Sequence, residues 1–166
     1  MSILYILCGV PGSGKSTWAC KKVEELGASK VAWVSRDKIR FSLLKPNEDY
    51  FAHEDEVRSI FIKEIQKAIS DEVEYIIADA THLTPKSRRS LVNQLTLNNT
   101  EIVYVCFMIP LEEAQRRNAK RSGRTLVPET IICKMYSSFS LPFGNLLLID
   151  ELGKEQEAFR SHDFCL

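Results

Sequence analysis

Four residues near the start of the chain have the types and the spacing of a phosphate-binding loop. Gly9, Gly14, Lys15 and Ser16 satisfy the pattern G-x-x-x-x-G-K-S/T within the stretch GVPGSGKSTW. Glycines let the backbone curl tightly, so that several N–H groups point at phosphate oxygens. In such a loop the lysine reaches the β- and γ-phosphates of a nucleoside triphosphate, and the hydroxyl ligates Mg²⁺. The pattern therefore predicts a nucleoside triphosphate site.

The segments on both sides of this loop give the context that the pattern requires. An uncharged apolar stretch at 3–8 precedes it and indicates a buried parallel strand. After the loop, apolar residues recur at helical spacing, namely Trp18, Ala19, Val23 and Leu26. Gly27 supplies a stop. The loop is therefore expected at a helix N-terminus, whose partial positive charge favours phosphate.

A carboxylate and a guanidinium follow the second apolar run, which spans 31–34. Asp37 and Arg40 are three residues apart at the opening of a predicted helix, so they are expected to share one face. A carboxylate at the carboxyl end of a neighbouring strand can accept a proton from an attacking hydroxyl. An arginine one turn later can hold an anion on the acceptor, most simply a phosphate. The alternative is a helix N-cap followed by a solvated charge.

The third apolar run, at 74–79, ends in Asp79 within EYIIADATHLTP. In a phosphoryl-transfer site, an aspartate in this place often holds Mg²⁺ through water or orients the acceptor. The alternative is ordinary turn chemistry, which aspartate also favours. Thr81 and His82 follow on the same loop, and no metal cluster is predicted from the three histidines, which are far apart in sequence.

A cluster of cations follows the fourth apolar run, at 101–109. Nine residues that contain no acid carry five positive side chains, namely Arg116, Arg117, Lys120, Arg121 and Arg124. The last four follow helical spacing, so a helix would present them together. One arginine supplied in this way can neutralise the charge on a moving phosphoryl group. Ser122 and Gly123 would let the segment close as a lid, although a solvated basic face is the alternative.

The order of these elements predicts the fold class. A fifth apolar run at 145–150 completes the series, and helical patterns lie between the runs, at 53–70, from Thr84-Pro85 and from Pro128-Glu129. Strands that alternate with helices indicate an α/β fold, with a parallel sheet of about five strands and helices on both faces. We expect a single domain over 1–166, a lid at about 111–127, and ligands at the carboxyl ends of the strands.

The composition limits the classes of protein. The 166 residues are 45% hydrophobic and 27% charged, and the net charge is zero, so any basic site must be local. The five cysteines are an odd number without a C-x-x-C pair, and Cys8 and Cys106 lie in apolar runs. This indicates reduced, mostly core cysteines in a cytoplasmic protein. No apolar stretch approaches membrane-spanning length, and no signal peptide or membrane contact is expected.

Four motifs in order resemble those of a known family. GVPGSGKSTW, SRDKIR, ADATHLTP and RRNAKRSGR followed by VPE are similar to the kinase domain of 5′-hydroxyl polynucleotide kinases of the bacteriophage and bacterial RNA-repair type. This family lies within the small P-loop kinases, and the resemblance extends from the first strand to about residue 143. It implies a P-loop kinase fold with a basic lid, ATP and Mg²⁺ as cofactors, and the 5′-hydroxyl ends of DNA or RNA as partners.

The resemblance also implies roles for individual residues. It assigns the ATP phosphates to Gly9, Pro11, Gly12, Ser13, Gly14, Lys15, Ser16 and Thr17, and to the lid arginines Arg117, Arg121 and Arg124. Lys15 and Arg121 also serve catalysis, and Asp37 is the general base. Arg40 grips the 3′-phosphate of the acceptor, and Ser16 and Asp79 hold Mg²⁺. Asp79, Thr81 and His82 form the acceptor edge, where the family often has asparagine in place of His82.

The residues leave three functions open. The leading hypothesis is a polynucleotide kinase with a footprint of a few nucleotides, without a phosphatase domain because no D-x-D-G-T motif occurs. The second is a kinase for a nucleoside, sugar or other small molecule, although the G-F-P-R segment of nucleoside-monophosphate kinases is absent. The third is an ATP-binding regulatory protein without phosphoryl transfer. The sequence does not distinguish DNA from RNA acceptors, nor does it predict an oligomeric state.

Overall fold

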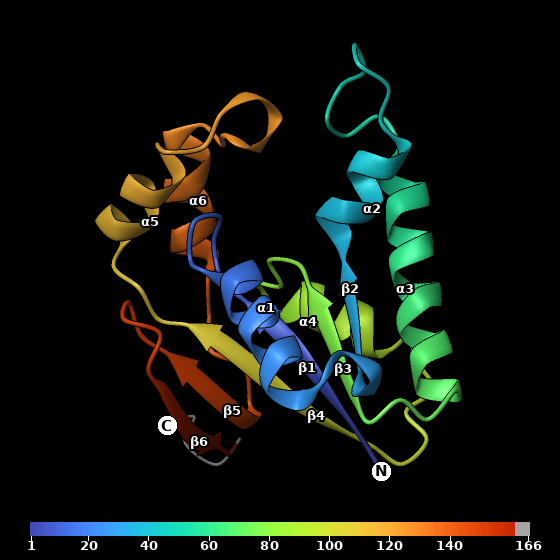
Figure 1. Cartoon of the computed structure of the whole chain (residues 1–166). Coiled ribbons are helices and arrows are strands. Elements are labelled where there is room, and N and C mark those ends of the chain that lie inside the picture. Colours follow the sequence, from blue (N-terminus) through green and yellow to red (C-terminus); the bar gives the residue numbers. More distant parts are fainter. Residues whose placement is uncertain (162–166) are drawn as a thin grey trace.

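A six-stranded sheet forms the centre of the molecule, in the order β2-β3-β1-β4-β5-β6. The computed structural model describes residues 1–161. Five strands run parallel, as predicted: β1 (Ser2–Cys8), β2 (Val31–Ser35), β3 (Tyr75–Asp79), β4 (Thr100–Phe107) and β5 (Gly144–Ile149). The sixth strand, β6 (Glu155–Arg160), pairs antiparallel with β5 at one edge (Figure 1). The prediction of about five parallel strands is confirmed, and β6 is an additional antiparallel strand that was not predicted because EQEAFR is a polar edge strand without an apolar run.

The register brings the carboxyl ends of the central strands level with one another. Ser35 at the end of β2 lies opposite Asp79 at the end of β3, and Cys8 at the end of β1 lies opposite Cys106 of β4. The residues that follow these strands are therefore delivered to one edge of the sheet, where parallel α/β folds bind their ligands.

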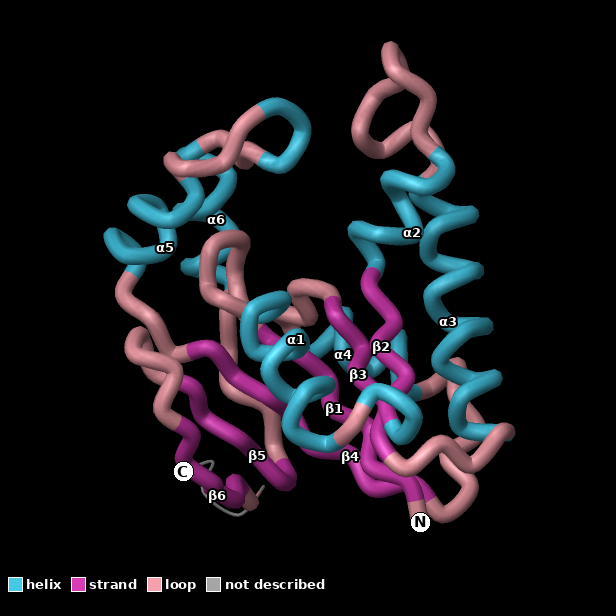
Figure 2. Tube along the Cα trace, viewed as in Figure 1, coloured by secondary structure: helices cyan, strands magenta, loops and turns pink. Residues whose placement is uncertain are grey.

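Helices cover both faces of this sheet, and the two faces have separate apolar clusters. On one face lies α1 (Lys15–Leu26) (Figure 2). Its residues Trp18 and Ala19 share an apolar cluster with Leu7 of β1. On the other face lie α3 (Glu54–Ser70) and α4 (Pro85–Val92). Phe61 and Ile65 of α3 pack there against the strand side chains that point to this face. Side chains of a strand point alternately to its two faces, so β1 contributes to both clusters.

The helix boundaries follow local signals in the sequence. Thr84 caps α4 through a capping box with Ser87, and Pro85 occupies the first helical position, as predicted. The remaining helices are α2 (Arg36–Leu43), α5 (Leu111–Asn118) and α6 (Glu129–Ser138), the last of which begins directly after Pro128.

The predicted helix through the basic cluster is wrong beyond Asn118, where α5 ends. The buried side chain of Asn118 donates a hydrogen bond from Nδ2 to the carbonyl of Val127 at 2.8 Å and accepts one from the Val127 amide at 3.1 Å. These two bonds hold both ends of the segment between them. Lys120 and Arg121 lie on a turn there and Arg124 lies in a short 3-10 helix (Gly123–Thr125), so the three do not share one face of an α-helix.

The cysteines agree in part with the prediction that they belong to the core. Cys8 and Cys106 are buried, Cys133 is half-buried and Cys20 is exposed, while Cys165 lies outside the described residues. In the part of the chain that the structure describes, no helix is long and apolar enough to span a membrane.

Candidate active site

The loop between β1 and α1 packs closely against α5, and this contact requires glycine. Gly12 and Gly14 have φ values of +82° and +97°, in the left-handed region. A Cβ atom on Gly12 would lie 2.5 Å from the carbonyl oxygen of Ala114 in α5. The loop therefore has the tight curvature that points backbone N–H groups at a phosphate.

The ammonium group of Lys15 folds back over this loop. Its Nζ donates hydrogen bonds to the carbonyls of Gly9 at 3.0 Å and Val10 at 2.9 Å. Burial lowers the pKa of Lys15 to about 8, an effect that the negative charges of Asp79 and Asp37 oppose. The positive charge of Arg121 lowers this pKa further. The structure thus brings together four predicted site residues from four separate segments of the chain.

Ser16 and Asp79 lie side by side, as expected for residues that hold a metal ion together. The Ser16 hydroxyl donates to Oδ2 of Asp79 at 3.2 Å, and the indole Nε1 of Trp33 donates to the same oxygen at 3.2 Å. Asp79 is buried, which raises its pKa. A hydroxyl and a carboxylate beside a phosphate loop are the hard oxygen donors that Mg²⁺ prefers, so these residues fit that ion.

Asp37 and Arg40 share one face of α2, as predicted. The helix is capped by Ser35, and Asp37 lies in its first turn, so the N-cap alternative for Asp37 is wrong. The Nη1 atom of Arg40 donates to Oδ1 of Asp37 at 2.6 Å. The Asp37 side chain is 66% exposed, whereas the Arg40 side chain is 6% exposed. The carboxylate therefore faces the open side of the site while the guanidinium lies beneath it.

Arg40 has further partners that sequence reasoning missed. Its Nη2 donates to Oε2 of Glu54 at 2.7 Å, and its Nη1 donates to the Tyr50 hydroxyl at 2.9 Å. The guanidinium also lies over the Tyr50 ring, 4.5 Å from the centroid. Glu54 receives a second guanidinium, that of Arg36. The available signals were weak: Tyr50 is an aromatic residue in a polar segment, and Glu54 is an acid in the first turn of a helix.

Thr81 and His82 meet the site in different ways. The Thr81 carbonyl accepts a hydrogen bond from the Gly9 amide at 3.0 Å, so this loop supports the phosphate loop through its backbone. His82 is only 6% exposed and lies against Phe61, with ring centroids 6.0 Å apart. Burial lowers the pKa of His82 to about 3, which keeps the ring neutral. The structure places His82 in the core below the site and not on its exposed rim.

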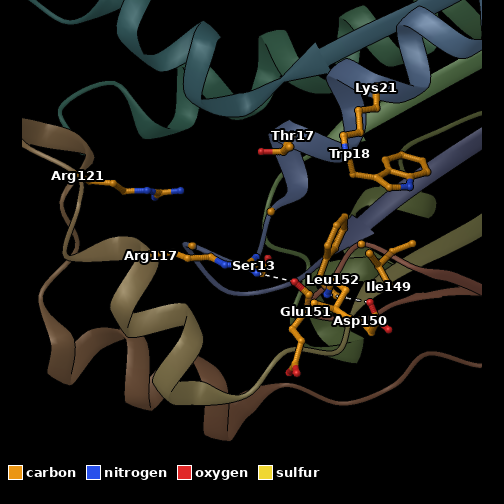
Figure 3. A pocket seen from close by; sticks show the side chains of 14 residues that line it. Ser13, Thr17, Trp18, Lys21, Arg117, Arg121, Ile149, Asp150, Glu151 and Leu152 are labelled. Carbon is orange, nitrogen blue, oxygen red and sulfur yellow. Dashed lines mark hydrogen bonds between the residues drawn. The ribbon is translucent and has the colours of Figure 1, made fainter.

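The basic segment divides its side chains among three places. Arg117 donates to Oε1 of Glu113 at 2.5 Å and to the carbonyl of Glu151 at 2.7 Å. Arg121 extends toward the phosphate loop, as Figure 3 shows. Arg124 reaches across to the other side of the site and donates to the carbonyls of Lys45, at 3.0 Å, and Pro46. The segments that meet through Arg124 stand on opposite sides of α1 in Figure 1.

A pocket of about 410 Å³ adjoins the phosphate loop (Figure 3). Its lining joins the loop and α1 to two arginines of the basic segment and to the turn between β5 and β6. It comprises Gly12, Ser13, Gly14, Thr17, Trp18, Lys21, Phe107, Arg117, Arg121, Ile149, Asp150, Glu151, Leu152 and Gly153. The Asp150 carboxylate holds this turn through the amides of Leu152, at 2.9 Å, and Lys154, at 2.8 Å. The volume of the pocket lies within the range of small-molecule sites.

Sequence reasoning did not predict that the turn between β5 and β6 lies at the site, because this turn is far along the chain from the phosphate loop. Its position directly after a parallel strand was the available signal. It also missed β6, which supports α1: the Trp18 indole donates to Oε1 of Glu155 at 2.7 Å, and Lys22 forms an ion pair with the same carboxylate.

Known proteins resemble this chain in sequence and in fold. A family model described as AAA domain matches residues 4–142. An L-seryl-tRNA(Sec) kinase from Methanococcus maripaludis is 29% identical over 143 residues, which are 84% of this chain and 53% of that protein. A chain in the structure of the Pnkp1/Rnl/Hen1 RNA repair complex superimposes with a TM-score of 0.70 and 26% identity, covering 82% of this chain and 43% of that one.

A third similar protein resembles this chain in fold alone. A sugar kinase from Janibacter sp. HTCC2649 superimposes with a TM-score of 0.64 at 14% identity, covering 90% of this chain and 86% of that one. These matches confirm the expected P-loop kinase fold. The chain spans about half the length of the tRNA kinase and of the RNA-repair chain.

Proposed function

The chain belongs to the AAA domain family and has the fold of the P-loop kinases, and from this premise we propose that it transfers the γ-phosphate of ATP to the 5′-hydroxyl of DNA or RNA. In this proposal the nucleoside of ATP occupies the pocket between α1 and the β5–β6 turn, and the triphosphate lies along the loop. Lys15 exchanges its two backbone carbonyls for phosphate oxygens. Ser16 and Asp79 would hold Mg²⁺, which supplies positive charge to the phosphates.

The observation that carries the proposal is the position of Asp37. Its exposed carboxylate stands at the carboxyl end of β2, within electrostatic reach of Lys15 and Asp79. A hydroxyl between Asp37 and the γ-phosphate loses its proton to the carboxylate while its oxygen forms a bond to phosphorus. The bond from phosphorus to the bridging oxygen of ADP breaks at the same time, and Arg121 and Lys15 stabilise the charge on the transferring group.

Two features support a nucleic acid as the acceptor. Phe51 is 62% exposed and Phe41 is 40% exposed, and both rings contact Tyr50 beside Asp37. Exposed rings next to a transfer site can stack on unpaired bases. The names of two similar proteins also refer to RNA: one is a seryl-tRNA kinase, and the other belongs to an RNA repair complex.

The test is transfer of labelled γ-phosphate to short 5′-hydroxyl DNA and RNA oligonucleotides, with nucleosides, sugars and seryl-tRNA as parallel acceptors. We expect label at the oligonucleotide 5′ end. We expect Asp37→Asn to bind ATP normally but to transfer roughly 10²- to 10⁴-fold more slowly. Asp71→Asn is the matched control, because this aspartate caps the far end of α3. Normal transfer by Asp37→Asn would show that another group is the base.

The second candidate is a kinase for a small hydroxyl compound. The observation that favours it is the state of Arg40, whose guanidinium is already paired with two carboxylates and is not free to receive an acceptor phosphate. Label on nucleosides or sugars, with none on oligonucleotides, would establish this function instead. ATP binding without label on any acceptor would favour the third function, a regulatory ATP-binding protein.

A further inference from the structure

The two oxygens of the Asp37 carboxylate have different surroundings. Oδ1 accepts hydrogen bonds from Nη1 of Arg40 at 2.6 Å and from the Tyr50 hydroxyl at 2.9 Å. Nη1 of Arg40 also donates to the Tyr50 hydroxyl, so the three groups close a triangle. Among residues 1–161, no hydrogen bond reaches Oδ2 of Asp37.

Arg40 is fixed in this triangle from several sides. Glu54 binds its Nη2 at 2.7 Å, and the rings of Tyr50 and Phe51 cover the guanidinium at 4.5 and 5.8 Å. The residue is 5% exposed. An approaching phosphate would have to displace one of two carboxylates from a nearly buried cation, which costs the desolvation and pairing energy of that carboxylate.

We infer that Arg40 and Tyr50 are positioning residues for Asp37, because both donate to Oδ1 and so present Oδ2 to the hydroxyl of the acceptor. The inference rests on the proposed role of Asp37 as the general base. Two donors on one oxygen fix the plane of a carboxylate, whereas a single donor leaves it free to rotate. The free oxygen is then the one that can accept the proton.

The surrounding charges are consistent with this arrangement. Arg40 and Tyr50 face Asp37 from α2 and the following loop, while the charge of Asp37 acts on Lys15 and Asp79 across the site. Burial and then the negative charge of Asp37 raise the pKa of Tyr50 to about 12, so its hydroxyl remains a donor at working pH. When Asp37 becomes neutral on taking the proton, Glu54 still balances the charge of Arg40.

Tyr50→Phe tests the inference because it removes the donor and keeps the ring. We expect kcat to fall about 10-fold for the best acceptor, with an unchanged KM for ATP and an unchanged thermal midpoint. In an Asp37→Asn background the same change should cost nothing more, because the group that Tyr50 positions is gone. Tyr136→Phe is the matched control, since it removes a hydroxyl bonded to the Ile109 carbonyl at 3.1 Å.

Each remaining outcome has a distinct meaning. Unchanged kcat in Tyr50→Phe, while Asp37→Asn is inactive, would overturn the positioning role and leave the proposed function intact. Full activity of Asp37→Asn would instead remove the proposed base. Arg40→Lys should lower kcat equally for a nucleoside and its 3′-phosphate. If it weakened only the 3′-phosphate, Arg40 would be a clamp on the acceptor and the inference would be wrong.

Discussion

The partly buried side chain of Lys15 predicts how the stability of the protein depends on pH. Burial lowers its pKa from 10.5 to about 8. In the unfolded chain the group keeps its proton up to its ordinary pKa, so between these two values the unfolded state binds more protons than the native state. The unfolding free energy therefore rises with pH across this window. The cost of the buried charge is fully present below pH 8 and is lost above about pH 10.5.

The magnitude follows from the same two values. A pKa lowered from 10.5 to about 8 corresponds to about 3 kcal/mol of unfolding free energy. Urea denaturation from pH 7 to 10.5 should show the wild type gaining about this amount relative to Lys15→Met, which lacks the titrating group. Lys63→Met, on the exposed side of α3, should follow the wild type. A constant difference between wild type and Lys15→Met would refute the claim that burial of this charge costs stability.

The same group makes ATP binding dependent on pH. Phosphate oxygens favour the charged lysine, so binding requires the proton that Lys15 has lost above pH 8. Between pH 7 and pH 9 the Kd for ATP should rise roughly 10-fold, which titration with Trp18 fluorescence can follow because Trp18 lines the pocket. A Kd that is flat over this range would show that Lys15 does not gain its proton on binding.

Two further predictions concern the phosphate loop and the rim. In urea denaturation, Gly12→Ala should lower the unfolding free energy more than Gly27→Ala does. Positive φ costs about 1–2 kcal/mol at both positions. Only the new Cβ at position 12 clashes with the Ala114 carbonyl, which adds about 1–3 kcal/mol. Equal losses would refute the packing argument. Phe51→Ala should raise the KM for oligonucleotides about 10-fold and leave the KM for ATP unchanged, with the exposed Phe159→Ala as control. An effect on ATP alone would contradict base stacking.

The sequence by itself determined the features that depend on local patterns. The five parallel strands, the phosphate loop, the cap at Thr84 and the aspartate that ends β3 each follow from a short stretch of residues. Such signals are strong because apolar runs, glycine turns and caps act within a few residues of one another. The meeting of Lys15, Asp37 and Asp79 also follows, since parallel strands deliver their carboxyl ends to one edge.

Partners that lie far apart in sequence were decided by the tertiary structure alone. Asn118 ends α5 through a bond to Val127, although helical spacing continues to Arg124. Helix propensity is weak, so one buried side chain with two backbone hydrogen bonds overrides it. The polar strand β6 likewise forms because β5 offers an unpaired edge, which no pattern within EQEAFR announces.

Arg40 and His82 show most clearly that contacts between distant segments cannot be predicted from local sequence patterns. The sequence placed a cation and an imidazole near the acceptor, but the fold neutralised Arg40 with Glu54 and Asp37 and buried His82 against Phe61. Whether a side chain faces a ligand or a neighbour depends on packing against elements that fold onto it from elsewhere in the chain. Residue types fixed which chemistry was available here, and three-dimensional packing decided which groups were free to perform it.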